Sequence, residues 1–397
     1  MSYPNIDIAT SKLALKVREF VDTQVVMHEH TLSAQQHGIS AQVRSQLQAS
    51  ARQSGVFAPT APREFGGLEL SHTAQAIVLE ESGRSLLGPT ALNCAAPDEG
   101  NIHLLNKVTN PEQRERYLGP LSRGEIRSSF AMTEPAPGAG ADPDALTTSA
   151  TRRDKGWVIN GTKWFTTGAE GAQFSIVMAR TGASATMFLV DADNPGMKIV
   201  RLLDTLDNAF AGGHAQIAFD DCFVPDDAIL GELDKGFEYA QVRLGPARLT
   251  HCMRWLGAAR RTHEVAVRYA TQRDLFGSKE SSLGMAQAMI ADNEIDIAAS
   301  RALIMQAAIV LDDGQAARKE TSIAKTFVAE AVNRVVDRSM QLCGGAGTTS
   351  DLPIAAIFKD IRAFRIYDGP SEVHRWSLSR RAVRQSENGI LPGDWNS

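Results

Sequence analysis

Residues 128–168 decide the fold of this chain, and they read SSFAMTEPAPGAGADPDALTTSATRRDKGWVINGTKWFTTG. The stretch opens with an extended run, Ser128–Met132, which stops at Thr133-Glu134-Pro135. A loop of Gly, Ala, Pro and Asp then covers residues 136–144. The backbone N–H groups of such a loop, together with the Thr133 hydroxyl, suit a phosphate or the polar edge of a ring. This stretch is therefore the first candidate for a binding site.

A strand over Trp157–Ile159 follows the loop, and Asn160-Gly161 comes directly after it. Asn-Gly between two apolar runs predicts a hairpin, because both turn residues must take a positive φ. Nearly all residues before this stretch read as helix, and so do those after about position 235. The chain is therefore predicted to insert a small β segment between two helical segments.

The composition is that of an ordinary globular protein. With 397 residues, the chain is expected to form two or three domains. Hydrophobic residues make up 43% and charged residues 22%, and no apolar run is long enough for a membrane span. The net charge of −5 and the lack of a Lys/Arg-rich face argue against a nucleic-acid binder.

The cysteines and the two ends of the chain bear on its location. Cys94, Cys222, Cys252 and Cys343 have neither disulfide nor metal-ligand spacing, so reduced and mostly buried thiols are expected, and no metal site. The N-terminus lacks a basic start followed by an apolar run, and the C-terminus is not a peroxisomal address. These features predict a cytoplasmic protein.

The periodicity of apolar residues divides the chain into three domains. Residues 1–127 carry apolar residues at helical spacing and are expected to form an N-terminal α-helical domain. Residues 128–233 alternate with period two, as in His214–Phe219, and predict a middle antiparallel β-barrel domain. Residues 234–397 carry long helical stripes with short connections and predict a C-terminal helical-bundle domain. The expected fold is mainly α with one β domain.

Several motifs resemble those of the acyl-CoA dehydrogenase family of flavoproteins. They are Thr133-Glu134-Pro135 with the Gly-rich loop Gly138–Asp142, Asn160–Lys163 with the aromatic-rich strand behind it, and Asp368-Gly369-Pro370. The resemblance runs almost the full length of the chain. It implies the three-domain fold of that family and FAD as cofactor.

The chain is most similar to one subgroup of that family. Most members have Tyr-Glu-Gly-Thr where this chain has Tyr367–Pro370, whereas a subgroup that includes the mammalian members ten and eleven has Asp-Gly-Pro. The chain shares with this subgroup Phe130–Pro135, the Asn-Cys-x-Ala-Pro-Asp motif at 93–98, and the run from Asp368 to His374. Those mammalian proteins also carry a kinase-like domain, for which 397 residues leave no room.

The resemblance implies α,β-dehydrogenation of an acyl-CoA thioester to a trans-2-enoyl-CoA. Asp368 would be the base that removes the proton α to the thioester carbonyl, and a hydride would leave the β-carbon for flavin N5. The backbone N–H of Asp368 and a ribityl hydroxyl of the flavin would hold the thioester oxygen. Arg248, Ala141 and Gly369 match positions that contact the substrate.

Simpler explanations stay open for some of these residues. Asp368 could be a helix cap or turn residue. Arg248 could be a solvated or ion-paired helix residue, and Gly344–Gly347 could merely end a helix. Three histidines lack ligand spacing and are interpreted as structural or surface residues: His214, His251 and His374.

The resemblance also carries over a set of cofactor contacts. Thr133 would donate to the polar edge of the isoalloxazine, Phe165 would cover the ring, and Thr167 would lie beside N5. Arg273 and Phe276 match a contact to the cofactor of a neighbouring subunit, where a guanidinium fork can bind pyrophosphate oxygens. The full set of expected cofactor-binding residues is Phe130, Met132, Thr133, Gly140, Ala141, Phe165, Thr167, Arg273, Phe276, Gln287, Gln341, Gly344, Gly345, Pro370 and Glu372.

The same resemblance implies the partners. They are an acyl-CoA substrate, an electron-transfer flavoprotein as acceptor, and further copies of the chain in a homodimer or homotetramer. Two other functions stay open. One is a flavin-dependent oxidase or monooxygenase on the same fold, and the other is a cofactor-poor scaffold protein.

Overall fold

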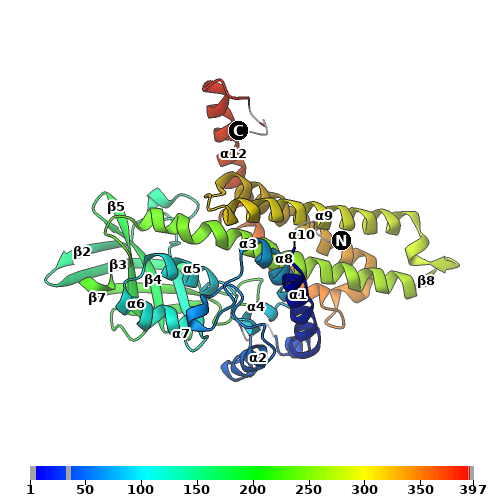
Figure 1. Ribbon diagram of the computed structural model, residues 1–397, viewed down its shortest axis with the longest axis horizontal. Coiled ribbons are helices and arrows are strands. Elements are labelled where there is room, and N and C mark those ends of the chain that lie inside the picture. Colours follow the sequence, from blue (N-terminus) through cyan, green and yellow to red (C-terminus); the bar gives the residue numbers. More distant parts are fainter. Residues whose placement is uncertain (1–5, 33–36, 392, 394–397) are drawn as a thin grey trace. The chain divides into compact units, whose positions relative to one another are not determined.

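The structure, a computed structural model, describes residues 6–32, 37–391 and 393 (Figure 1). The chain forms two compact units, residues 1–247 and residues 248–397. The first unit contains short helices and the large sheet, whereas the second is helical apart from a small hairpin. The predicted N-terminal and middle domains both fall within the first unit, and the boundary drawn between them at residue 127 stays a prediction.

Capped helices make up the N-terminal part of the first unit. The side chains of Asp7, Ser40 and Ser71 each accept a hydrogen bond from a backbone N–H in the first turn of the helix that follows. Arg18 of the first helix binds Glu81 of the third through two N–H donors, at 3.0 and 2.6 Å. The α-helices are α1 (Ile8–Phe20), α2 (Ala41–Gln53), α3 (His72–Ser82), α4 (Gly88–Ala91), α5 (Asp98–Val108), α6 (Pro111–Gln113) and α7 (Gly119–Ser122).

A seven-stranded sheet forms the rest of the first unit (Figure 1). Its strands are β1 (Ser128–Ala131), β2 (Ser149–Arg153), β3 (Gly156–Thr167), β4 (Phe174–Thr181), β5 (Ser184–Asp191), β6 (Met197–Leu202) and β7 (His214–Pro225). They pair in the order β1-β4-β2-β3-β7-β6, with β5 beside β4. The antiparallel character predicted for the β domain is wrong in part. The sheet is mixed, because β1 and β2 pair with β4 in parallel while the other pairings are antiparallel.

The period-two segments bury one face of this sheet. Ile159, Val177, Phe188 and Ile217 are buried together, and the rings of Trp157 and Phe188 lie 5.9 Å apart. The strands predicted over 157–159 and 214–219 are confirmed. Alternation therefore identified the strands correctly, since their alternate residues face a common core.

The hairpin predicted at Asn160-Gly161 is wrong. β3 continues through both residues, and the turn back lies at Asp154-Lys155, between β2 and β3. The register between β3 and β7 shifts at this point, where the Asp221 N–H donates to Asn160 Oδ1 at 2.8 Å. Gly161 is required for another reason, because a Cβ there would lie 2.7 Å from the Cα of Thr148. The Asn-Gly pair thus marks a β-bulge instead of a turn.

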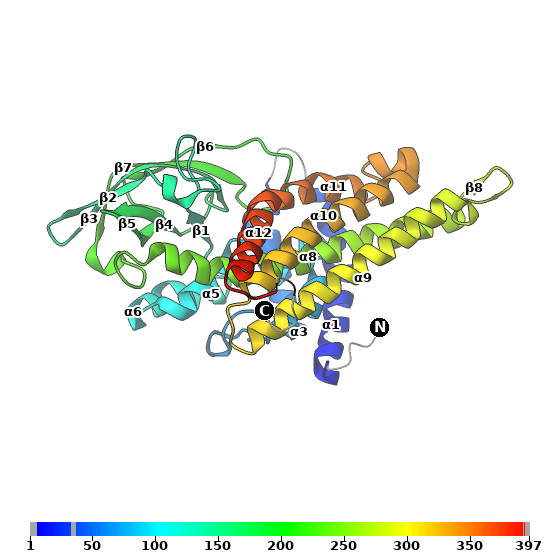
Figure 2. The same cartoon turned by 90° about the horizontal axis from the view of Figure 1, so that it is seen from above.

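Long helices form the second unit (Figure 2). They are the later part of α8 (Gly236–Gln272), α9 (Gly284–Asp312), α10 (Arg318–Cys343), α11 (Ile354–Arg362) and α12 (Ser371–Glu387), with a hairpin of β8 (Asp274–Leu275) and β9 (Ser278–Lys279). α9 and α10 run side by side in Figure 2, and Arg338 of α10 binds Asp296 of α9 at 2.8 Å. α9 ends at Asp312, and Asp313 and Gly314 lie in the connection to α10. None of the described helices is both long and apolar enough to cross a membrane.

One buried carboxylate holds the loop that follows β1. Glu134 Oε1 accepts hydrogen bonds from Lys163 Nζ and the Thr148 N–H, both at 2.8 Å, and Oε2 accepts from the Thr147 N–H and hydroxyl at 2.8 and 2.7 Å. The side chains of Glu134 and Lys163 are fully buried. Burial alone would raise the pKa of Glu134, but the hydrogen bonds from Lys163 and Thr148 lower it to about 2. The carboxylate is therefore ionised at neutral pH.

Glu134→Gln is expected to lower the free energy of unfolding by about 3–5 kcal/mol, because it leaves the Lys163 charge buried without its partner. Calorimetric unfolding of both proteins measures the loss. The contribution of the ionised Glu134 carboxylate to the wild-type advantage should decline as the pH falls from 4.5 towards 2. The sign follows because the unfolded carboxyl binds its proton at a higher pH than the folded one does.

An exposed pair provides the control. Glu238→Gln removes one partner of the exposed Lys235–Glu238 pair and should leave the unfolding transition unchanged. Equal losses in the two variants would contradict the role assigned to Glu134.

Candidate functional site

The residues expected to form the site fall into two groups, one in each unit. The group in the first unit consists of Phe130, Met132, Thr133, Gly140, Ala141, Phe165 and Thr167. The group in the second unit consists of Arg248, Arg273, Phe276, Gln287, Gln341, Gly344, Gly345, Asp368, Gly369, Pro370 and Glu372.

In the first unit, the end of β1 and the end of β3 lie together. Lys163 Nζ donates to the Met132 carbonyl at 2.9 Å, and the Trp164 N–H donates to the Thr133 carbonyl at 2.9 Å. Met132 and Thr133 are therefore fixed beside the strand that carries Phe165. The structure thus brings together expected site residues from two segments that are separated by the whole Gly-rich loop.

Phe165 is presented outward by a second bulge in β3. Its φ is +47°, a region that bulky L-residues rarely adopt, and the register with β7 shifts between Lys163 and Thr166. The side chain is 47% exposed. A backbone strained in this way persists only where several surrounding contacts hold it in place. Such residues concentrate at functional sites. An exposed ring held in one orientation suits a planar ligand.

Thr167 belongs to a hydrogen-bonded chain of three side chains. Its hydroxyl lies 2.9 Å from His214 Nδ1, and His214 Nε2 lies 2.8 Å from Asp207 Oδ2. Asp207 and His214 are buried. The interpretation of His214 as a structural histidine is thus correct, although the structure gives it specific partners that its spacing does not reveal.

Two other parts of this group differ in exposure. Phe130 is half-buried, and the Arg243 guanidinium lies over its ring at 4.0 Å from the centroid. Arg243 also donates to Asn101 Oδ1 at 2.7 Å, so this face of Phe130 is occupied by protein. Gly140 and Ala141 are exposed in the Gly-rich loop, where their backbone is open to a ligand.

In the second unit, Asp368 lies in a turn with left-handed backbone. Its φ is +54°, and that of the following Gly369 is +95°. The Asp368 side chain is 19% exposed, and its Oδ2 lies 3.5 Å from Nε2 of the buried His251. The residue is not an N-cap, because Pro370 occupies that position of α12. The interpretation of Asp368 as a turn residue is correct, and it is compatible with a chemical role for the carboxylate.

Cationic side chains hold the backbone of this turn. Arg248 Nε donates to the Asp368 carbonyl at 2.8 Å, and Lys325 Nζ donates to the Gly369 carbonyl at 2.7 Å. His374 Nε2 lies 3.3 Å from the same Asp368 carbonyl. Burial lowers the pKa of Lys325 to about 8, while the Asp368 carboxylate opposes that shift. Buried donors thus fix two consecutive carbonyls of the turn that carries the carboxylate.

Glycine is required at position 369. A Cβ there would lie 2.8 Å from His374 Nε2, and the φ of +95° is unfavourable for any L-side chain. The Asp-Gly pair therefore follows from the geometry of the turn.

The remaining residues of the second group lie on α9, at the end of α10, at the small hairpin and, for Glu372, in the first turn of α12. Gly344 ends α10 with a φ of +54°, and a Cβ there would lie 3.3 Å from Arg273 Nη1, so these two expected contacts are adjacent. The helix end expected at Gly344–Gly347 is confirmed. Phe276 sits at the tip of the β8–β9 hairpin and is 95% exposed. The other exposed members of the group are Gln287, Gln341, Gly345 and Glu372.

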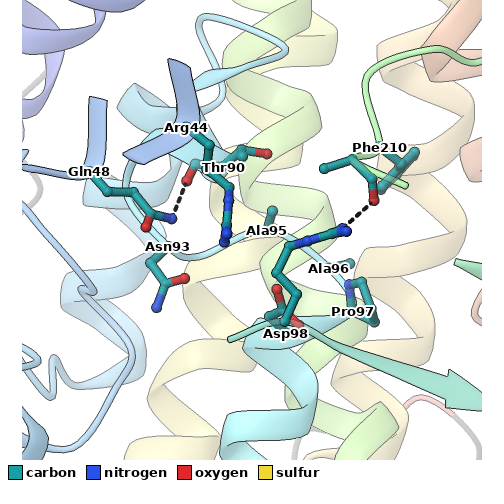
Figure 3. A pocket seen from close by; sticks show the side chains of 11 residues that line it. Arg44, Gln48, Thr90, Asn93, Ala95, Ala96, Pro97, Asp98 and Phe210 are labelled. Atoms are coloured by element: carbon teal, nitrogen blue, oxygen red, sulfur yellow. Dashed lines mark hydrogen bonds between the residues drawn. The ribbon is translucent and has the colours of Figure 1, made fainter. Parts of the chain in front are cut away.

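A pocket in the first unit is lined by other residues (Figure 3). It encloses about 400 Å³ including its open mouth. Figure 3 shows Arg44, Gln48 and Thr90 on one side of it and Asp98 and Phe210 on the other. None of the residues expected to bind cofactor or substrate lines this pocket.

Sequence reasoning missed several residues that shape the site. Lys325 lies in the buried stripe of α10, and a lysine among buried apolar residues is a signal that could have been noticed. The partners of Glu134 and of Asp368 come from distant parts of the chain, which no local pattern reveals. The residues whose supporting role in the site was not predicted are Glu134, Lys163, Asp207, His214, His251 and Lys325. Within the described part of the chain, no group of His, Cys, Asp or Glu side chains is arranged to hold a metal ion.

Three family profiles match the chain almost end to end. Acyl-CoA dehydrogenase, N-terminal domain, matches residues 10–125. Acyl-CoA dehydrogenase, middle domain, matches residues 129–222, and acyl-CoA dehydrogenase, C-terminal domain, matches residues 234–383.

Individual relatives agree with these profiles. Acyl-CoA dehydrogenase family member 11 of Gallus gallus is 35% identical over 391 residues, which are 93% of this chain and 50% of that protein. FadE2 of Mycobacterium tuberculosis, also named as an acyl-CoA dehydrogenase, is 37% identical over 354 residues, which are 86% of each chain. A solved structure from Mycobacterium abscessus that bears the same family name superposes with a TM-score of 0.88 at 35% identity, covering 96% of this chain and 100% of that one. This chain spans about half the length of family member 11.

A helical N-terminal domain, a middle β domain and a helical C-terminal domain define a three-domain flavoprotein fold. The chain belongs to the acyl-CoA dehydrogenase family, and members of this family bind FAD. A Mycobacterium smegmatis glutaryl-CoA dehydrogenase solved with FADH2 shares the fold, with a TM-score of 0.85 at 21% identity over 98% of this chain and 97% of that one. The predicted fold class is thereby confirmed.

The residues of the first unit fit a flavin ring. An exposed, conformationally fixed Phe165, the hydroxyls of Thr133 and Thr167, and the exposed loop backbone at Gly140 combine one aromatic face with polar groups. This combination is what a planar ring with a polar edge requires.

Lys325→Met is expected to loosen the turn that carries Asp368, because the Gly369 carbonyl loses its buried donor. Amide hydrogen exchange in residues 366–371 should accelerate about tenfold or more, as a loss of about 1–3 kcal/mol implies. Lys359→Met, at an exposed site on α11, is the control, and unchanged exchange in both variants would refute the support assigned to Lys325.

Proposed function

We propose that this chain catalyses the FAD-dependent α,β-dehydrogenation of an acyl-CoA thioester to a trans-2-enoyl-CoA. The observation that carries the proposal is the Asp368 carboxylate in a turn whose carbonyls face Arg248 and Lys325. Membership of the acyl-CoA dehydrogenase family supports the substrate class.

Asp368 acts as the base in this proposal. Removing a proton α to a thioester carbonyl needs a carboxylate that is ionised and aimed at the carbon. The nearby Arg248 favours the anionic form, because an opposite charge stabilises it. The backbone N–H of Asp368 is proposed to donate to the thioester oxygen, which stabilises the developing enolate. Aspartate reaches one methylene less far than glutamate, so the direction fixed by the turn matters more.

The residues of the first unit are proposed to hold the flavin. Bound FAD would supply the acceptor for the hydride that leaves the β-carbon. Thr133 is proposed to bind the polar edge of the ring, Phe165 to cover one face and exclude water, and Thr167 to approach N5. Pro370 stands where many relatives have a Thr, so one hydroxyl contact to the flavin is absent from this proposal.

The proposed acceptor of the electrons is an electron-transfer flavoprotein. This follows from the reaction class, since the reduced cofactor must be reoxidised after each turnover. Oxygen consumption by the protein during turnover would instead support an oxidase.

Asp368→Asn is expected to slow reduction of the bound flavin by its best acyl-CoA by about 10²- to 10⁴-fold, the usual contribution of a positioned general base. Anaerobic stopped-flow absorbance measures the rate. Retention of FAD and an unchanged circular dichroism spectrum would show that the variant is folded.

Asp313→Asn, at the exposed end of α9, is the matched control and should reduce at the wild-type rate. Flavin reduction at the wild-type rate in Asp368→Asn would contradict the assignment of Asp368 as the base.

We also propose that the chain assembles with further copies of itself. Phe276 is 95% exposed at a hairpin tip, and Arg273 directly precedes that hairpin and lies against Gly344, which suits a contact to the FAD of a neighbouring copy. The proposed assembly is a homodimer or homotetramer whose cofactor sites are completed across an interface.

Phe276→Ala is therefore expected to weaken FAD binding by about 10- to 100-fold, as the loss of about 1.5–3 kcal/mol from one buried aromatic side chain implies. Titration of the apoprotein with FAD measures the affinity, and light scattering measures the mass. Phe358→Ala, at an exposed site on α11, should bind FAD normally. A monomeric wild type that retains FAD would rule out the shared site.

A further inference from the structure

In the hydrogen-bonded chain Thr167–His214–Asp207, only Thr167 has a part in the function as proposed so far. Thr167 ends β3 and His214 begins β7, and the two are direct partners in the β3–β7 register. Asp207 lies in the segment that leads into β7, and its carboxylate reaches back to the imidazole at 2.8 Å. The geometry is therefore set by strand pairing at one end and by a buried carboxylate at the other.

Burial restricts the movement of the side chains in this hydrogen-bonded chain. The exposed fraction is 8% for His214 and 4% for Asp207. The rings of Phe210 and Phe165 flank the imidazole, with centroid distances of 5.4 and 6.4 Å. The imidazole consequently has little freedom to turn away from its two partners.

The positions of the hydrogens follow from the chemistry of the three groups. Burial by itself raises the pKa of Asp207, but the interactions with His214 and Thr205 together outweigh it and the pKa is lowered, so Asp207 is an ionised acceptor. His214 Nε2 must then carry the hydrogen that is shared with Asp207. In a neutral imidazole the other nitrogen, Nδ1, is an acceptor, and it takes the hydrogen of the Thr167 hydroxyl.

This arrangement decides what Thr167 offers to a ligand. Its only hydroxyl hydrogen points inward to His214, so the oxygen presents lone pairs to its other side. Thr167 can therefore accept a hydrogen bond from a ligand N–H, and it cannot donate one while the imidazole stays neutral.

We propose that Asp207 and His214 are positioning residues that make Thr167 a hydrogen-bond acceptor, so that the site favours reduced FAD over oxidised FAD. The proposal rests on the proposed function, in which Thr167 approaches flavin N5. That nitrogen carries a hydrogen in the reduced ring and only a lone pair in the oxidised ring. An acceptor at this position stabilises the reduced ring, whereas a donor would stabilise the oxidised one.

Asp207→Asn tests the proposal, because it reverses the direction in which hydrogen bonds are donated along Thr167, His214 and residue 207. The side-chain amide can donate to His214 Nε2, which moves the imidazole hydrogen to Nδ1 and turns Thr167 into a donor toward the ligand. In serine proteases, an Asp-to-Asn change behind the catalytic histidine reverses the tautomer in the same way. Thr167→Val removes the hydroxyl altogether and tests the same contact independently.

The first measurement is the midpoint potential of the bound flavin, taken anaerobically by equilibration with a reference dye. Thr167→Val should reduce the preference for reduced over oxidised FAD about tenfold, which is about 30 mV in a two-electron couple. Asp207→Asn should lower the potential by at least as much. Asp204→Asn, at an exposed site three residues away, should keep the wild-type potential.

The second measurement needs no cofactor. Nitrogen-15 spectra of histidine-labelled protein, with His214 assigned from a His214→Gln variant, report which ring nitrogen carries the hydrogen. The wild type should carry it on Nε2, and Asp207→Asn should carry it on Nδ1. A wild-type hydrogen on Nδ1 would overturn the proposal, even if the variants failed to fold.

Failure of the proposed function is distinguishable from failure of the roles given to Asp207 and His214. A wild-type chain that binds no FAD overturns the proposed function. Normal FAD binding with equal potentials in the wild type, Thr167→Val and Asp207→Asn overturns only the roles of Asp207 and His214.

Discussion

The buried ion pair between Glu134 and Lys163 holds the part of the first unit on which the candidate site depends. The loop after β1 has little regular secondary structure, so its backbone N–H groups need other partners. The Glu134 carboxylate supplies them at Thr147 and Thr148, while Lys163 binds both that carboxylate and the Met132 carbonyl. Removing two charges from water costs free energy unless hydrogen bonds satisfy both groups. Here those hydrogen bonds join the loop to β3. The position of every expected flavin contact near Met132 follows from this pair.

The turn that carries Asp368 follows the same principle. It is also irregular, and buried cationic side chains on α8 and α10, Arg248 and Lys325, bind its carbonyls. In each unit, a residue with positive φ carries a side chain of the proposed site, and buried charges bind the backbone of the neighbouring residues. Unfavourable backbone geometry at Phe165 and Asp368 can persist because these contacts over-determine it.

Much of the fold could be predicted because it depends on local patterns. Helical stripes identified α9 and α10, alternation identified β3 and β7, and the glycine turn at Gly344 marked a helix end. Asn160-Gly161 was misread because the same pair that favours a turn also permits a bulge, and only the partner strand at Asp221 decides between them. The local signal was real, but a long-range pairing determined its outcome. The site could be predicted only in part, for a similar reason. Family motifs point to Asp368, Phe165 and Thr167 as functional positions, yet they do not reveal what supports those positions. Glu134 and Lys163 are 29 residues apart, and Lys325 reaches a carbonyl 44 residues away. Such contacts depend on tertiary packing, so no spacing rule predicts them.

Oxidation of an acyl-CoA thioester by a bound flavin is the reaction on which the proposed roles of these residues depend. The most direct test is the visible spectrum of the purified wild-type protein under anaerobic conditions, before and after addition of a panel of acyl-CoA thioesters of different length and branching. We expect oxidised flavin bands that bleach with at least one thioester. A protein without flavin bands after incubation with excess FAD, or flavin bands that no thioester in the panel bleaches, would contradict this reaction.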